Sequence, residues 1–139
     1  MRNEYGFGIV VNLPFAVAIE SLTAALQTEG FGVLTDIDVA ATFKKKLDKE
    51  MPPYRIIGAC NPSLAATALD SEPSIGLLLP CNVVVREDDH QQVHIEFMDP
   101  IALMNLVGKP EIDLLAETVR GKLQRVMQSL TPSPLSRSA

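Results

Sequence analysis

The chain has 139 residues, of which 47% are hydrophobic and 21% charged, and its formal net charge is −5. This length and composition predict one globular domain, and the absence of Trp means that aliphatic side chains must fill its core. The acidic balance argues against a partner held mainly through phosphate groups, so nucleic acid is not an expected partner.

The first half of the chain predicts strands that alternate with helices. Residues 5–11 favour a strand, and an apolar repeat at Phe15, Ile19, Leu22 and Leu26 predicts a helix that ends at Gly30. Residues 31–37 and 54–60 favour two further strands. Between them, Asp38 can cap a short helix, on which we expect a buried stripe and a solvated basic face; the stripe is Val39, Phe43 and Leu47, and the basic residues are Lys44, Lys45 and Lys46.

In the second half, two Pro-initiated helices and a hairpin are predicted. Asn61-Pro62 and Asp99-Pro100 each pair a capping residue with a proline suited to a first helical turn. Residues 77–87 favour a long strand bent near Pro80, and a polar turn at 88–91 returns the chain to a strand at 93–97. A last helix follows Gly108 and carries one apolar stripe up to Leu130.

These elements predict an α+β fold with a single mixed, largely antiparallel sheet of about five strands and helices packed on one face. The domain is expected to cover residues 1–130, followed by a disordered C-terminal tail at 131–139. Tyr5, Phe7, Ile9, Val84 and residues 77–79 offer more apolar surface than one layer of helices would cover. An uncovered apolar face usually marks an interface, so we expect a homodimer.

Neither a membrane span nor a secretory signal is predicted. The longest apolar run, at 77–85, is interrupted by Pro80 and Asn82 and is much shorter than the roughly 20 residues that cross a bilayer. The first residues are broken by Gly6 and Gly8 rather than forming a continuous apolar segment. We therefore expect a cytoplasmic protein with no membrane partner.

Three sequence blocks carry a family resemblance. Residues 32–39 (GVLTDIDV), 53–62 (PYRIIGACNP) and 72–85 (EPSIGLLLPCNVVV) resemble the signature blocks of the bacterial "domain of unknown function 302" family. The resemblance implies a compact α+β dimer. It supplies no established catalytic residues, so every candidate site residue must come from its own chemistry.

The two cysteines, Cys60 and Cys81, are the main candidates for chemistry, and two interpretations stay open. Cys60 lies just before the helix started by Asn61-Pro62, where the helix field favours a thiolate, so Cys60 could attack and Cys81 resolve in a redox or sulfur-transfer reaction. Alternatively, both are small apolar residues at strand ends. A reducing compartment favours free thiols over a disulfide. Cys60, Cys81 and His94 lack the four close ligands of a structural zinc site, so no metal is predicted.

Polar residues at strand ends form a second set of candidates. Asp36 and Asp38 are two apart on a strand and could form an acid and base pair, or Asp38 could only cap a helix. Asn61, Asn82 and Asp99 could surround a pocket for a carboxylate, phosphate or sulfur oxyanion near helix N-termini. His94 alternates with the apolar residues of its strand, so it faces the polar side and is a surface residue or a catalytic base.

Two hypotheses of function follow from these residues. The first is a dimeric binding or interaction domain that holds a small anionic or apolar ligand near Cys60 and Cys81. The second is thiol chemistry at those two residues. The nucleophile elbow, the phosphate-binding loop, the H-E-x-x-H motif and the dinucleotide fingerprint are all absent from the sequence, so no cofactor is predicted and an enzymatic role stays open.

Overall fold

The structure is a computed structural model that describes residues 3–130. Five strands form one sheet in the order β1-β5-β4-β3-β2; they are β1 (Gly6–Val11), β2 (Gly32–Asp38), β3 (Tyr54–Cys60), β4 (Cys81–Glu87) and β5 (Val93–Met98). All four neighbouring pairs are antiparallel, whereas the sequence predicts a mixed, largely antiparallel sheet. The α+β class and the five-stranded sheet are confirmed. The tail predicted at 131–139 lies outside the described residues.

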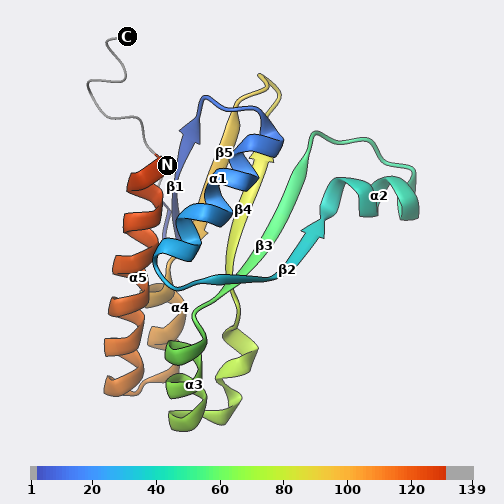
Figure 1. Ribbon diagram of the computed structural model, residues 1–139. Helices are drawn as coiled ribbons and strands as arrows, with labels where there is room; N and C mark the ends of the chain where they lie inside the picture. The colour runs from blue at the N-terminus through green and yellow to red at the C-terminus, as the bar shows by residue number, and fades with distance from the viewer. Residues whose placement is uncertain (1–2, 131–139) are drawn as a thin grey trace.

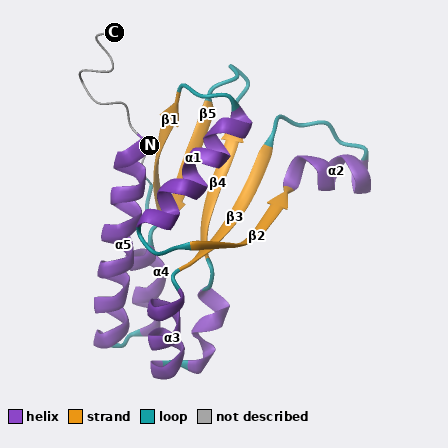
Figure 2. Cartoon of the chain, viewed as in Figure 1, coloured by secondary structure: helices purple, strands orange, loops and turns teal. Residues whose placement is uncertain are grey.

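The described residues also form five α-helices and two short 3₁₀ helices, whose arrangement around one face and one end of the sheet is shown in Figure 1. The α-helices are α1 (Phe15–Thr28), α2 (Val39–Leu47), α3 (Pro62–Ser71), α4 (Pro100–Met104) and α5 (Pro110–Leu130), and the 3₁₀ helices are η1 (Pro73–Leu78) and η2 (Asn105–Val107). Helices α1 and α5 pack against one face of the sheet, while α3 and α4 lie beyond one end of the central strands (Figure 2). Within residues 3–130, no helix combines the length and apolar character that a bilayer crossing needs.

The main core lies between the sheet and helices α1 and α5. Strand β5 alternates buried and half-buried residues along its length, which is the pattern of a strand with one covered face. Its Phe97 stacks on Phe7 of β1 with ring centroids 5.6 Å apart, and both rings are buried. Leu22 of α1 and Leu123 of α5 are fully buried against this layer. The predicted place of Phe7 on the uncovered face is therefore wrong.

Three predicted helix caps are confirmed by hydrogen bonds. The Ala41 amide donates to Asp38 Oδ1 at 2.8 Å, the Leu64 amide donates to Asn61 Oδ1 at 3.4 Å, and the Ile101 amide donates to Asp99 Oδ1 at 3.0 Å. Pro62 and Pro100 follow two of these caps at the first helical position, where a missing N–H has no cost. Cap and proline together fix where each helix leaves its strand.

The long strand predicted at 77–87 is wrong in its first part. Residues 73–78 form η1, and β4 begins only at Cys81. Pro73 starts helical turns, and Pro80 cannot donate to a strand ladder, so the apolar run at 77–79 does not join the sheet. Instead, η1 carries Ile75 into a second apolar cluster with α3, α4 and α5.

The stripe predicted to be buried on α2 is also wrong. Helix α2 has no buried residue, and Leu47 is 67% exposed. The reason is tertiary, because β2 and β3 carry α2 past the area that α1 and α5 cover, and α2 projects from the edge of the sheet (Figure 1). The predicted solvation of the basic residues holds for Lys44, Lys45 and Lys46, which are exposed.

The second sheet face carries a mixture of polar and apolar side chains. Val10 and Asn82 are exposed there, and Val84 is half-buried. Arg86 Nε donates to Glu96 Oε1 at 2.6 Å across β4 and β5. His94 shares this face with Glu96, so its predicted place on the polar side of β5 is confirmed.

Candidate functional site

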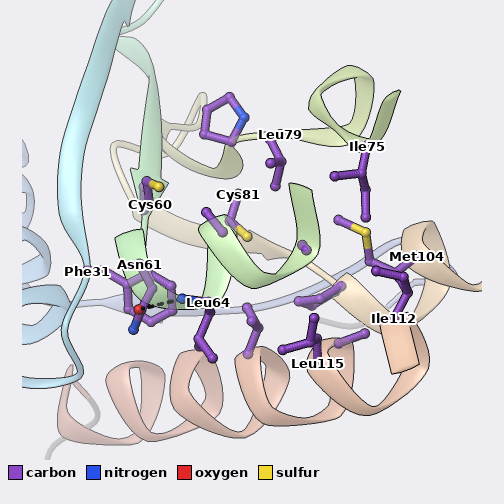
Figure 3. Close-up of a pocket in the computed structure, with 17 residues that line it drawn as sticks. Phe31, Cys60, Asn61, Leu64, Ile75, Leu79, Cys81, Met104, Ile112 and Leu115 are labelled. Carbon is purple, nitrogen blue, oxygen red and sulfur yellow. Dashed lines mark hydrogen bonds between the residues drawn. The ribbon is translucent and has the colours of Figure 1, made fainter. Parts of the chain in front are cut away.

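The cavity between the lower end of the sheet and the helices beyond it is the candidate site (Figure 3). It forms where β3 ends and β4 begins. Because Ala59 pairs with Cys81 in the antiparallel register, Cys60 and Cys81 lie at the same end of neighbouring strands. The cavity measures about 50 Å³.

The wall of this cavity is almost entirely apolar. Helix α3 contributes Leu64, Ala65 and Ala68, and α5 contributes a stripe that includes Ile112 and Leu115. The remaining wall comes from strand ends, η1 and α4: Phe31, Ala59, Ile75, Leu79, Pro80, Pro100 and Met104. No charged side chain lines the cavity. A guest would therefore meet mainly aliphatic carbon and the sulfur of the two cysteines.

Cys81 is the more deeply placed of the two thiols. It is 7% exposed, and burial raises its pKa to about 11, with a smaller contribution from the neighbouring Cys60. Desolvation disfavours the thiolate because a charged sulfur would lose its hydration inside an apolar wall. Cys60 is half-buried, and both cysteines are free thiols. At neutral pH, Cys81 therefore behaves as a small apolar residue.

Asn61 is the one amide side chain in the cavity wall, and its polar atoms are already engaged. Its Nδ2 donates to the Glu29 carbonyl at 3.2 Å, and its Oδ1 accepts from the Leu64 amide and, at 3.2 Å, from the Ser63 hydroxyl. Gly30, with φ of +83°, makes this contact possible, since a Cβ there would lie 3.0 Å from Asn61 Nδ2. Asn61 thus joins the start of α3 to the end of α1.

Polar contacts outside the cavity hold its walls together. Lys109 Nζ donates to the Ser71 carbonyl at 2.8 Å, and the Ser71 hydroxyl donates to Glu111 Oε1 at 3.1 Å, so the end of α3 is tied to the start of α5. On the other side, Arg125 of α5 hydrogen-bonds to the Glu29 carboxylate at 2.9 Å, and these bonds lower the pKa of Glu29. The helices that enclose the cavity are fixed by contacts made away from it.

The predicted polar candidates do not gather around the cysteines. Asp36 pairs with Arg55, whose Nε donates to Asp36 Oδ1 at 2.7 Å, and these hydrogen bonds lower the pKa of Asp36. Asp38 caps α2, and its main-chain carbonyl accepts from the Thr42 hydroxyl at 2.8 Å. Each of the two carboxylates therefore has its own structural contact.

Three more candidates also lie away from the cavity. Asn82 is exposed and lines a shallow hollow on the open sheet face instead. Asp99 caps α4 and pairs with Arg120 at 3.3 Å, and only the adjacent Pro100 reaches the cavity. His94 Nε2 lies 2.8 Å from Asp88 Oδ2 in the β4–β5 hairpin. Asn61, Asn82 and Asp99 do not converge on one pocket.

Sequence reasoning places Cys60, Cys81 and Asn61 in the site but misses most of its wall. The sequence predicts Met104 on a short helix and Leu79 on a strand, it assigns Ile75 to no element, and it gives no reason to expect any of them beside the thiols. The signal that existed was the spacing of Ile112, Leu115 and Val119 on α5, which indicates a buried face but not what that face meets. Within residues 3–130, no three His, Cys, Asp or Glu side chains are grouped so that they could hold a metal ion.

The fold and the cavity define an antiparallel α+β domain with an apolar recess at the end of its sheet. The model of the "Domain of unknown function DUF302" family matches residues 7–130, and the chain belongs to this family. A crystal structure of an uncharacterized conserved DUF302 protein from Bacillus stearothermophilus has a TM-score of 0.85 and 26% sequence identity to this chain, over 91% of this chain and 98% of that one. A search of the curated proteins found no match. The family resemblance of the cysteine-containing blocks is confirmed.

Proposed function

We propose that this protein is a homodimeric binding domain that holds a small neutral, apolar molecule, or the apolar end of a longer one, in the cavity beside Cys60 and Cys81. One observation carries the proposal: the cavity has a solvent-facing mouth and an apolar wall without a charged side chain. Its volume of about 50 Å³ is well below the roughly 300–1,000 Å³ of pockets that enclose drug-sized ligands, so the guest is a small molecule or only the apolar end of a longer one. Water in such a recess finds few partners, so an apolar group can displace it.

An anionic ligand fits this cavity poorly. Burying a charge without a partner costs several kcal/mol in proteins, on the order of the energy of the whole binding event for a small molecule. The Asn61 Nδ2 donates one hydrogen to Glu29, and its second N–H is a single neutral donor, which does not offset the cost of a buried charge. Of the two ligand classes that the sequence leaves open, these contacts favour the apolar one.

The alternative of thiol chemistry receives less support. A Cys81 thiol with a pKa of about 11 is almost entirely protonated at neutral pH, whereas the resolving role assigned to Cys81 in that hypothesis needs a thiolate. Its neutral sulfur is instead well suited to a soft, polarizable wall. The proposed roles are therefore passive, with Cys81 lining the recess and Cys60 at its edge.

A matched pair of ligands and a matched pair of variants test the binding proposal. We expect 1-hexanol to shift the ¹³C methyl resonances of Met104 and Ile75 saturably, and hexanoate to bind at least about tenfold more weakly because its carboxylate must shed water. Ala65→Leu places extra carbon in the cavity and should abolish the shifts. Ala66→Leu, on the exposed side of the same helix, should leave them unchanged. Equal binding of hexanoate, or unchanged binding by Ala65→Leu, would contradict an apolar site.

The homodimer part of the proposal is supported by apolar surface that no helix of the same chain covers. Val10 on the open sheet face is 49% exposed, and on the same face Val84 lines a hollow with Tyr5 and Met98. Surfaces of this kind commonly mark protein contacts. Sedimentation equilibrium tests this part of the proposal, because it gives the molar mass of the protein in solution.

A further inference from the structure

The segment of residues 32–53, here called the arm, comprises β2, α2 and the loop that returns to β3. No side chain of β2 or α2 is buried. Figure 1 shows α2 projecting beyond the edge of the sheet, far from α5, and Figure 2 shows that the outer ends of β2 and β3 have no helix over them. The arm is attached to the domain mainly through the antiparallel pairing of β2 with β3.

Exposed apolar side chains are concentrated in this arm. Of the twelve large hydrophobic residues exposed within residues 3–130, four lie between positions 33 and 47: Val33, Leu34, Ile37 and Leu47. They do not share one face. Val33 pairs with Ala59 and so points to the sheet face that α1 and α5 cover farther along the sheet. Ile37 pairs with Ile56 and points to the opposite, open face. Water therefore meets apolar carbon on both sides of the arm.

Helix α2 has limited support within its own chain. It has nine residues, and helices shorter than about 12–15 residues are marginal in water unless they pack on something. Val39 and Phe43 are half-buried, and no residue of the helix is fully buried. Its local aids are the Asp38 cap at one end and an exposed ion pair of Lys44 with Asp48 at the other, and such a pair contributes only about 0.3–0.5 kcal/mol at this spacing. A further surface over α2 would therefore stabilise it.

The charge of α2 indicates what kind of surface this is. The helix carries Lys44, Lys45 and Lys46 and no acidic residue, so it contributes +3 to a chain whose formal net charge is −5, and the remainder is −8. Within residues 3–130, no acidic side chain pairs with Lys45 or Lys46. The arm as a whole has no net charge, because its four lysines are balanced by four acidic residues, so the basic patch is local to α2. This patch is complementary to the acidic remainder of another copy of the same chain.

A groove on the inner side of the arm offers a place for such a contact. Phe15 at the start of α1, Ala40 and Ala41 of α2, and Met51 and Pro53 of the return loop line a hollow of about 350 Å³. In a two-fold dimer, the same surface meets itself, so each copy can place its arm in the groove of the other. The arm has 22 residues, which is close to the roughly 20–30 that each partner contributes to a standard interface.

We propose that two copies of this chain associate by clasping arms, with the apolar side chains of each arm covered by the other copy. This inference rests on the proposed homodimer and names the surface that forms it. A basic amphipathic helix can also lie on an anionic membrane. A flat bilayer, however, can cover only one side of the arm, whereas the exposed apolar residues lie on both.

The experiment compares two glutamate substitutions of equally exposed leucines. Leu34 in the arm and Leu114 on α5 are each 65% exposed, so Leu34→Glu and Leu114→Glu differ in place and not in burial. Sedimentation equilibrium should give the wild type twice the chain mass of 15.1 kDa. Leu34→Glu should raise the dimer Kd about thirtyfold or more, the effect of losing a contact worth about 2 kcal/mol, and Leu114→Glu should not change it.

Hydrogen exchange of α2 supplies a second readout that does not depend on a folded variant. In the wild type, α2 amides should gain protection as protein concentration rises through the dimer Kd, while amides of α5 should not change. A monomeric wild type would overturn both the dimer and the clasped arms but not the ligand cavity. If the wild type is a dimer and Leu34→Glu does not change its Kd, the clasped arms are overturned and the dimer is not. If the wild type is a monomer that binds anionic vesicles through α2, the arm contacts a membrane instead of a second copy.

Discussion

The protonation state of Cys81 gives the sharpest test of how the cavity works. The pKa of about 11 means that roughly 0.01% of the side chain is thiolate at pH 7, compared with about 3% for an ordinary thiol of pKa 8.5. Ionisation alone would therefore slow alkylation about 300-fold. A thiolate of higher pKa is intrinsically more nucleophilic, which recovers roughly tenfold, so a net slowing of about thirtyfold remains.

The assay is alkylation by iodoacetamide of the Cys60→Ser variant, in which Cys81 is the one remaining thiol. Rates are measured by mass spectrometry from pH 7 to pH 9.5, once in the folded protein and once in urea. The folded protein should react at least about thirtyfold more slowly at pH 7, because burial restricts access in addition to ionisation. Its rate should rise throughout the range without levelling, since the pKa of about 11 lies above it.

A rate that levels off at or below pH 9 in the folded protein would refute this reasoning. It would mean that Cys81 ionises as easily as a thiol in water, and the hypothesis of thiol chemistry would regain its support. Circular dichroism at each pH controls for unfolding. The Cys81→Ser variant, which retains only Cys60, shows whether the half-buried thiol behaves differently.

Two further predictions concern residues that hold the site and the hairpin. Asn61→Ala should lower the free energy of unfolding by about 1–3 kcal/mol, because it removes both the cap of α3 and the hydrogen bond to the Glu29 carbonyl. Asn61→Asp keeps the cap and should lower it less. Equal losses for the two variants in urea denaturation would contradict a stabilising role of the bond to Glu29. Hydrogen bonds from His94 and from backbone amides lower the pKa of Asp88 to about 2, so its stabilising contribution is complete above pH 4 and is lost as the pH falls toward 2. The stability difference between the wild type and Asp88→Asn should therefore shrink to about half at pH 3, and a constant difference between pH 7 and pH 3 would contradict the assignment.

Much of the fold could be predicted because the decisive interactions are local. The caps at Asp38, Asn61 and Asp99 act within three residues of their own positions, so a short stretch of sequence specifies them. The alternation of Val93, Ile95 and Phe97 likewise indicates a strand with one covered face. These signals do not depend on the rest of the chain.

The candidate site could be predicted only in part for the same reason. Cys60 and Asn61 adjoin a local helix start, and their place at a strand end follows from it. That Cys81 lies beside them depends on the register of β3 and β4, and the apolar wall depends on α4 and α5, which are far away in sequence. Whether the thiols meet water, charge or aliphatic carbon is therefore not encoded near either cysteine.

The sequence by itself determined the α+β class, the helix starts at three caps and the position of Cys60 at a strand end, because each depends on neighbours a few residues away. Only the tertiary structure decided which faces are covered. The apolar residues of α2 recur at a helical spacing, as those of α1 do, yet α1 lies over the sheet and the arm lies beyond it. Burial depends on what the rest of the chain, or a second chain, places opposite a surface, and no local pattern contains that information.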